Sequence, residues 1–143
     1  MESCINISKQ VSLSSYSRGC HQITDTILRS IQSDLSSIRI GLLHLFCSHT
    51  SCSISIASNS PSYSSFIEST LNTLVPESAS YRHSMEGPDD MPAHVKSSLL
   101  STSHAIPISN GRLLLGNNQA IYFCEHRDYV RSRKLQLFLQ GTS

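Results

Sequence analysis

Many of the residues that could perform chemistry in this 143-residue chain lie in one short segment. The stretch YRHSMEGPDDMPAHVK, residues 81–96, contains two histidines, three acidic residues and one lysine, in a chain that is otherwise rich in serine. Imidazoles and carboxylates serve as metal ligands or as general acids and bases, and an ammonium group binds anions such as phosphate. This segment is therefore the first candidate for a functional site.

Three of the seven histidines are expected at places from which a side chain can reach a shared cleft. His49 follows an apolar run, His83 lies in a polar loop, and His94 lies in the first turns of a predicted helix. Imidazoles from three separate elements can hold a catalytic Zn²⁺ with an open fourth position. Because no pair has HxH or HExxH spacing, ordinary surface or core histidines remain the alternative. His44, within IGLLHLF, is interpreted as a hydrogen-bonded histidine of a sheet.

The charged residues around His94 allow two interpretations. Asp90, four residues earlier, could cap the predicted helix or orient the imidazole of His94, and capping is favoured. Lys96 does not share a helical face with His94, but both would lie near the helix N-terminus, where backbone N–H groups favour an anion such as phosphate. Arg18 and Arg112 lie beside predicted turns and could add phosphate contacts, with solvated surface cations as the alternative.

Ser51, two residues after His49, raises the possibility of a serine nucleophile. No GxSxG elbow accompanies it, and a Ser/His pair is expected by chance in so serine-rich a chain. The five cysteines are odd in number and lack CxxC spacing, so a secreted disulfide framework is not expected. We expect most of them to be small buried hydrophobic side chains, with a catalytic thiol as the minority interpretation.

Composition excludes several classes of partner. The chain is 38% hydrophobic and 15% charged with a net charge of +1, so no overall field drives binding to nucleic acid or to an acidic membrane. The one basic cluster, in residues 127–134, is interpreted as a solvated turn. No signal peptide is recognised, and no apolar run approaches the roughly 20 residues that span a bilayer. We expect a soluble cytoplasmic protein with neither nucleic acid nor membrane as its partner.

The elements that must position these residues follow from hydrophobic periodicity, and we expect one domain over residues 1–143. Spacings of three and four residues predict a helix over 24–34, with Thr24 or Asp25 as its cap, a second between Pro61 and Pro76, and a third over 91–100. Alternation and apolar runs predict strands over 4–13, 38–46, 52–57, 105–108, 112–115, 120–125 and 134–139. Clustered strands and an Asn-Gly turn favour an α+β fold with a mainly antiparallel sheet and two to three helices.

Several motifs in their order resemble the YjbQ family, also called secondary thiamine-phosphate synthase proteins. They are GLLHLFCSHTSCSISI, LVPE, YRHSMEGPDDMPAHVKSSLL, IPISNGRLLLG with Gln119 three residues later, and EHR at Glu125. The resemblance extends from SRG at Ser17 to the final LQLFLQG. It implies a small α+β fold containing a β-sandwich, and assembly as a homotrimer.

The resemblance also implies a site. Histidines matching His49, His83 and His94 would gather there and hold a divalent metal, for which histidine ligands suit zinc better than magnesium. The predicted polar neighbours of this metal and of a small phosphorylated molecule are Asn59, Glu86, Asp90, Lys96 and Gln119, with Arg18, Arg112 and Ser51 as further contacts.

The activity implied for family members is thiamine-phosphate synthesis, which joins an aminopyrimidine diphosphate to a thiazole phosphate and releases pyrophosphate. This chain departs from the family pattern: Ala57, Ser58 and Pro61 replace an asparagine, a glutamate and an aspartate, and Asn118 replaces a tryptophan. If the lost groups position substrate, the alternatives are a non-enzymatic metal- or ligand-binding trimer and a metal-dependent hydrolase of a phosphorylated substrate.

Overall fold

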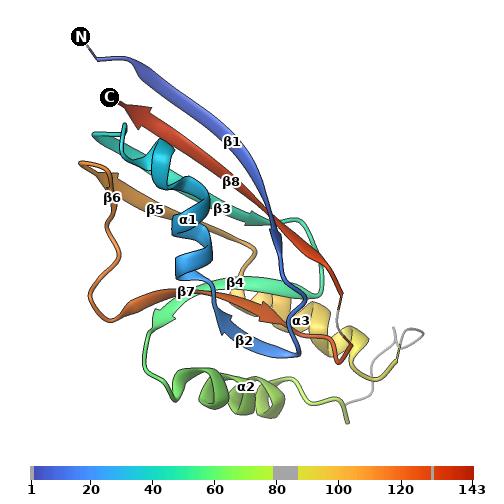
Figure 1. Ribbon diagram of the computed structural model, residues 1–143. Coiled ribbons are helices and arrows are strands. Elements are labelled where there is room, and N and C mark those ends of the chain that lie inside the picture. Colours follow the sequence, from blue (N-terminus) through green and yellow to red (C-terminus); the bar gives the residue numbers. More distant parts are fainter. Residues whose placement is uncertain (1, 79–86, 130) are drawn as a thin grey trace.

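The computed structural model describes residues 2–78, 87–129 and 131–143. Within these residues the chain forms eight strands and three helices, and strands predominate at both ends of the chain (Figure 1). The elements in chain order are β1 (Cys4–Leu13), β2 (Gly19–Gln22), α1 (Thr24–Leu35), β3 (Ile40–Cys47), β4 (Cys52–Ser58), α2 (Tyr63–Leu74), α3 (Asp90–Leu100), β5 (Ser103–Ser109), β6 (Arg112–Leu113), β7 (Gln119–Glu125) and β8 (Arg133–Thr142).

The larger sheet has the strand order β1-β8-β3-β5-β6, and every neighbouring pair is antiparallel. β8 lies between β1 and β3 and pairs with both strands. Phe138 of β8 is therefore opposite Ser8 of β1 on one side and His44 of β3 on the other. In β3 the odd-numbered residues Leu43 and Leu45 are buried, whereas Ile40 and Leu42 face outward. One face of this sheet therefore contributes to the core and the other is exposed.

The smaller sheet has the order β2-β7-β4 and is also antiparallel. β3 and β4 are joined by a short turn over residues 48–51, yet they belong to different sheets. This turn therefore carries the chain from one layer to the other. The α+β prediction with mainly antiparallel strands is confirmed.

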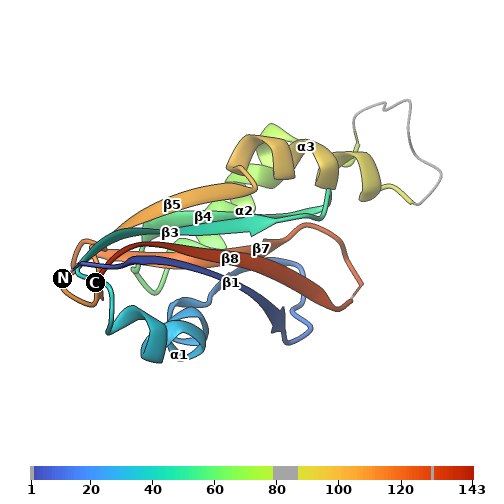
Figure 2. The ribbon, with the colours of Figure 1, turned by 90° about the horizontal axis from the view of Figure 1, so that it is seen from above.

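The core lies between the inner faces of the two sheets and α1. Figure 2 shows α1 on one side of the strands and α2 with α3 on the other. α1 buries Ile27, Ile31 and Leu35, which recur at the helical spacing of about four residues. These side chains pack with buried residues of β3, β4, β5, β7 and β8, including Leu43, Ile54, Ile106, Phe123 and Leu137.

Most predicted elements differ from the structure by a few residues at their ends, but one strand was missed and one helix cap was wrong. The four residues of β2 were not predicted, because GCHQ is too short to show an alternating pattern. The predicted cap of α1 is wrong, since the helix starts after Ile23 without a side-chain cap. The Thr24 hydroxyl instead accepts a hydrogen bond from the backbone N–H of Ile121, at 2.9 Å. It thereby ties α1 to β7.

The cysteines differ in part from the expectation of buried single thiols. Cys20 and Cys124 lie opposite each other in β2 and β7 and form a disulfide. Cys4 is a free exposed thiol, whereas Cys47 and Cys52 are free and buried as expected. Among the described residues, no helix is both long and apolar enough to cross a membrane.

Candidate functional site

A groove of about 860 Å³ lies between the turn that follows β3 and one face of α3. Hydroxyl side chains make up more than half of its lining, and His49 and His94 contribute the two imidazoles. The lining residues are Phe46, Cys47, Ser48, His49, Thr50, His94, Ser97, Ser98, Ser101 and Thr102. Two of the three predicted histidine ligands are thus brought to one groove by elements that are far apart in the sequence.

His94 is held at both ring nitrogens. Its Nδ1 lies 2.8 Å from the carbonyl oxygen of Thr50, and because a carbonyl can only accept, Nδ1 carries the proton. Its Nε2 lies 3.1 Å from Oδ1 of Asp90, one helical turn earlier. An Nδ1–H bonded to a backbone carbonyl leaves Nε2 as the nitrogen that would bind a metal. In this structure Nε2 faces the carboxylate of Asp90, so a metal ion would bind His94 only by displacing that contact.

Asp90 does not cap α3, contrary to the favoured interpretation. The N-cap position belongs to Asp89, and no side chain caps the helix there. The Asp90 side chain is fully buried, and its Oδ1 accepts a hydrogen bond from Nη1 of Arg127 at 2.8 Å. The alternative interpretation, a carboxylate that orients His94, agrees with the contact between the two side chains.

The guanidinium of Arg127 also binds Asp89, at 3.0 Å between Nε and Oδ2. The same carboxylate accepts the backbone N–H of Asp128 at 2.9 Å. Burial alone would raise the pKa of Asp89, but these two donors outweigh burial and lower it. Both acidic residues at the start of α3 are therefore tied to the segment that follows β7.

His49 lies on the opposite side of the groove from α3. Its Nε2 accepts a hydrogen bond from the backbone N–H of Lys134, at 3.2 Å, so His49 is attached to the start of β8. Partial burial, assisted by the positive charge of Arg133, lowers the pKa of His49 below its usual value. The arrangement favours a neutral imidazole with Nε2 as the acceptor.

Ser51 lies behind the same turn and does not have the contacts of a nucleophile. Its hydroxyl accepts a hydrogen bond from Nη2 of Arg133 at 2.8 Å. Arg133 also donates to both carboxylate oxygens of Glu125, each at 2.7 Å, in a buried bidentate pair. Arg127 and Arg133 are both buried, so the predicted solvated turn is wrong for these two members of the basic cluster. Lys134 is exposed, as that prediction required.

Lys96 faces away from the groove, as its spacing of two residues from His94 predicts. It is 1% exposed, and its Nζ donates to Oδ1 of Asn72 at 2.7 Å. Burial, and then the nearby charge of Arg18, lower the pKa of Lys96. Arg18 donates to the same oxygen at 2.8 Å and to the carboxylates of Glu68 and Asp128 at 3.1 and 2.8 Å.

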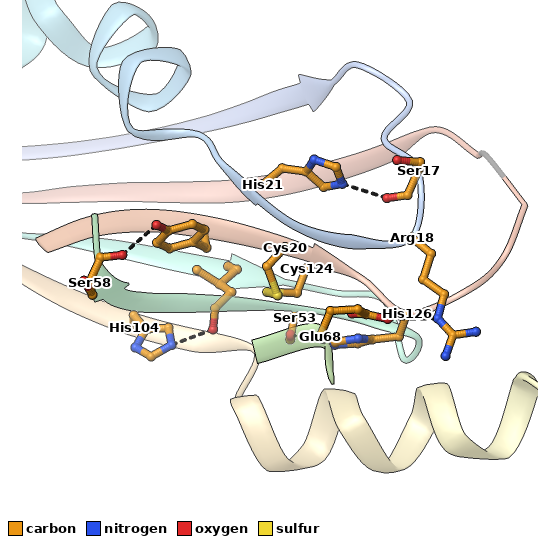
Figure 3. Close-up of a disulfide and its surroundings, with 12 residues drawn as sticks. Ser17, Arg18, Cys20, His21, Ser53, Ser58, Glu68, His104, Cys124 and His126 are labelled. Atoms are coloured by element: carbon orange, nitrogen blue, oxygen red, sulfur yellow. Dashed lines mark hydrogen bonds and ion pairs between the residues drawn. A yellow bond between two sulfur atoms is a disulfide. The ribbon is translucent and has the colours of Figure 1, made fainter. Parts of the chain in front are cut away.

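His126 lies beside this second polar cluster. Figure 3 shows it next to Ser53, whose hydroxyl lies 2.9 Å from Nε2, with Glu68 and Arg18 close by. Burial, followed by the positive charge of Lys96, lowers the pKa of His126 to about 3. His126 is therefore a neutral imidazole in the folded protein at ordinary pH.

Asn59, Gln119 and Arg112 lie away from the groove. Gln119 pairs with Ser58 at the end of β4, whereas the groove adjoins the other end, where Cys52 pairs with Glu125. Seven residues of β4 separate these ends, which corresponds to roughly 20 Å. Asn59 donates from Nδ2 to the carbonyl of Asn117 at 3.2 Å, and the side chain of Gln119 accepts the N–H of Gly116. Arg112 is part of β6, at the edge of the larger sheet.

Two residues of the predicted metal site, His83 and Glu86, lie outside the described residues. Among the residues that are described, no three His, Cys, Asp or Glu side chains are placed to hold a metal ion together. His49 and His94 are of the residue type that binds zinc, and a complete site requires a further donor such as the predicted His83. In this structure Nε2 of His49 accepts the N–H of Lys134 and Nε2 of His94 faces Asp90, so metal binding would replace both contacts.

A thiol pair at the base of the turn was not predicted as part of the site. The Sγ atoms of Cys47 and Cys52 lie 3.2 Å apart. The hydrogen bond between the thiols lowers the pKa of Cys47 to about 7 and raises that of Cys52. The sequence signal was the placement of one cysteine on each side of SHTS.

The comparisons with known proteins agree along nearly the whole chain. The family model described as UPF0047 protein YjbQ-like matches residues 9–142. The UPF0047 protein YjbQ of Escherichia coli O157:H7 is 42% identical over 134 residues, which are 93% of this chain and 96% of that protein. The UPF0047 protein sll1880 of Synechocystis sp. is 43% identical over 108 residues, 74% of each chain.

Solved structures lead to the same family. A YjbQ/UPF0047-family protein from Clostridium acetobutylicum has a TM-score of 0.80 at 32% identity, covering 92% of this chain and 98% of that one. A YbjQ-like protein from Sulfolobus solfataricus has a TM-score of 0.86 at 18% identity, with coverages of 97% and 99%, and supports the fold alone. From the family model and the close relatives, we conclude that the chain belongs to the YjbQ-like UPF0047 family.

Proposed function

We propose that the groove binds a small phosphorylated molecule together with a divalent metal ion, and that the protein is a transferase of the thiamine-phosphate synthase type. The observation that carries this proposal is the placement of His49 and His94, from different elements, in one hydroxyl-lined groove. Hydroxyl groups are neutral donors suited to phosphate oxygens, and imidazoles are suited to a metal. The hydroxyls of Ser97, Ser98 and Ser101 already donate to backbone carbonyls, so the hydroxyls that would meet phosphate are those of Ser48, Thr50 and Thr102. The reaction class rests on the family resemblance.

Zinc fits this donor set better than magnesium. Imidazole nitrogen is a common ligand of Zn²⁺, whereas Mg²⁺ prefers oxygen ligands and keeps several waters. His49 and His94 would hold the ion with His83 as the predicted third ligand. A bound divalent ion would supply positive charge to stabilise the departing pyrophosphate as the new carbon–nitrogen bond replaces the carbon–oxygen bond.

The remaining groups around the groove would position ligand and metal. The carbonyl of Thr50 and the carboxylate of Asp90 fix the ring of His94 on opposite sides. The charge of Asp90 is balanced by Arg127, which is itself buried. The ring is therefore held in one orientation, and a metal ion would bind it by taking the place of Asp90 at Nε2 while the bond from Nδ1 to Thr50 is kept.

We further propose that the protein assembles as a homotrimer through the outer face of the larger sheet. Four large apolar side chains are exposed there on β3 and β8: Ile40, Leu42, Phe46 and Phe138. Large apolar side chains exposed on one face in this way are typical of a subunit interface. Phe46 also lines the groove, so a neighbouring subunit packed on this face would border the ligand site.

A non-enzymatic binding protein is the second candidate. The observation that favours it is the distance between the groove and the polar end of β4, where Asn59 and Gln119 lie. That end also carries the replacements Ala57, Ser58 and Asn118. If the substrate required those groups, the protein would have lost catalysis but would still bind metal and phosphate at the groove.

Metal analysis tests the site first. The purified protein and the variants His49→Ala and His94→Ala are loaded with zinc or magnesium, dialysed and analysed for metal content. We expect one zinc per chain in the parent protein and a loss of at least tenfold in zinc affinity in each variant. His21→Ala serves as the matched control, because His21 contacts the carbonyl of Ser17 and the ring of Tyr16, in a different part of the fold. Equal zinc binding in all four proteins would remove the metal site from the proposal.

Turnover separates the candidate functions. The zinc-loaded protein is mixed with the aminopyrimidine diphosphate and the thiazole phosphate, and thiamine phosphate and pyrophosphate are quantified. Equimolar formation of both products, lost in His94→Ala, supports the transferase. Release of inorganic phosphate without condensation identifies a hydrolase. Binding of pyrophosphate with neither reaction identifies the binding protein.

A further inference from the structure

The turn that carries His49 is bracketed by two free thiols in contact. Cys47 is the last residue of β3, and Cys52 is the first residue of β4. Their Sγ atoms are 3.2 Å apart although the two strands belong to different sheets. The four residues between them include His49 and Thr50, both of which line the groove.

We propose that Cys47 and Cys52 form a reversible dithiol–disulfide pair that clamps the turn carrying His49. A disulfide requires its sulfurs about 2.05 Å apart, so the bond needs an approach of roughly 1 Å. The other cysteines do not compete within the protein. Cys20 and Cys124 already form a disulfide, and Cys4 pairs with Thr142 at the opposite end of β8 from Leu135, the partner of Cys47.

The two thiols differ in their access to an oxidant. Both thiols are buried, with 1% of Cys47 and none of Cys52 exposed, but only Cys47 lies in the wall of the groove. A small oxidant such as hydrogen peroxide that enters the groove therefore meets Cys47 first. Cys52 is then the resolving thiol, held in contact and shielded from other reactants.

The chemistry is complete with peroxide as the oxidant. The sulfur of Cys47 attacks one peroxide oxygen, the O–O bond breaks, and a sulfenic acid and one water are formed. The sulfur of Cys52 then attacks the sulfenic sulfur, the S–S bond forms, and the hydroxyl leaves with the thiol proton as a second water. The two thiols lose two electrons and two protons, and the peroxide is reduced to two waters. A small dithiol restores the reduced pair by exchange.

Oxidation would act on a turn that is already attached on several sides. The carbonyl of Thr50 binds His94, the hydroxyl of Ser51 binds Arg133, and the carbonyl of Cys52 accepts the hydroxyl of Ser97 at 2.7 Å. Drawing the sulfurs together shortens the base of the turn while these contacts hold its tip. The oxidised and reduced proteins should therefore differ in the spacing between His49 and His94. This inference requires neither a bound metal nor the transferase activity.

The test uses the full chain with Cys4→Ser, which removes the exposed thiol and any disulfide between molecules. The protein is treated with hydrogen peroxide, unfolded in guanidinium with excess maleimide, and digested with trypsin without reduction. Residues 40–82 contain no internal lysine or arginine, so Cys47 and Cys52 stay on one peptide, apart from Cys20 and Cys124. Mass spectrometry then counts the maleimide groups on that peptide.

We expect the peptide from untreated protein to carry two maleimides. The peptide from oxidised protein should carry none and be lighter by two hydrogen atoms, and treatment with a dithiol should restore both adducts. In a Cys52→Ser variant the reaction should stop at a sulfenic acid on Cys47, which dimedone captures. Two maleimides after peroxide treatment would overturn the proposal. So would a sulfenic acid on Cys47 that persists after the peroxide is removed although Cys52 is present.

Discussion

Asp90 and His94 lie one turn apart on α3, and their side chains meet at 3.1 Å between Oδ1 and Nε2. The same oxygen of Asp90 accepts a hydrogen bond from Arg127 at 2.8 Å. A groove imidazole is thereby connected through one buried carboxylate to a buried guanidinium. The orientation of His94 depends on groups that never touch a ligand.

Replacing Asp90 with asparagine should weaken metal binding. The amide keeps the shape of the side chain but loses the charge that orients the ring of His94, so we expect zinc affinity to fall about 10- to 100-fold. Competition with a fluorescent chelator measures the change. Asp25→Asn is the control, because Asp25 is exposed at the start of α1. Equal zinc affinity in both variants would contradict a positioning role for Asp90.

Replacing Glu125 with glutamine should destabilise the protein strongly. Arg133 would remain buried without its carboxylate partner, and an uncompensated buried charge costs about 3–5 kcal/mol in the free energy of unfolding. The matched control is Asp34→Asn, which breaks the half-exposed pair between Asp34 and Lys9 and should cost under about 1 kcal/mol. Urea unfolding measures both variants. Similar losses in the two would show that the Glu125 pair contributes no more than a surface pair.

His126 should make stability depend on pH. Its pKa is about 3 in the folded state, against about 6.5 for an ordinary histidine. As the pH falls through this interval, the unfolded chain takes up a proton that the folded protein does not. The free energy of unfolding should therefore decrease by up to about 1.4 kcal/mol per pH unit.

His126→Gln isolates this contribution, because glutamine does not titrate. Urea unfolding between about pH 7 and pH 5 should show a shallower decrease for this variant than for the parent protein. His21→Gln, on the outer strand of the smaller sheet, should retain the parent slope. If the free energy of unfolding of His126→Gln decreased with pH as steeply as that of the parent protein, other groups would cause the pH dependence.

The proposed trimer predicts a sharp effect on the outer face of the larger sheet. Phe138 is 46% exposed in the middle of β8, and Phe138→Glu would place a charge within the apolar face. We expect this variant to be a monomer by light scattering at micromolar concentration, where the parent protein is a trimer. Phe66→Glu should stay trimeric, although Phe66 on α2 is more exposed, at 74%. A parent protein that is itself monomeric would rule out the assembly.

Periodicity predicted the elements well where one face of a strand is buried. The alternation in β1 and the helical spacing in α1 both come from a single buried face, and both elements lie where expected. The assignment of β3 and β4 to different sheets could not be predicted, because the turn between them resembles a hairpin connection. A local pattern shows which face of a strand is buried, but it does not show which strand pairs with it.

The same distinction applies to the site. The opposite orientations of His94 and Lys96 follow from helix geometry, and the spacing predicted them. The burial of Arg127 and Arg133 did not follow, because a run of basic residues looks solvated until its acidic partners are known. One of these partners, Asp89, is 38 residues away in sequence. Tertiary packing determines such pairs, and the local sequence does not predict which residues it brings together.

The two imidazoles of the groove stand on different layers of the fold. His49 is attached to β8 of the larger sheet through Lys134, whereas His94 belongs to α3, which packs against β4 of the smaller sheet. The distance between the two imidazoles consequently depends on how the two sheets pack against each other. Replacing a core residue such as Ile54 could shift one sheet slightly relative to the other. Such a shift would change the distance between His49 and His94 without altering any residue that lines the groove.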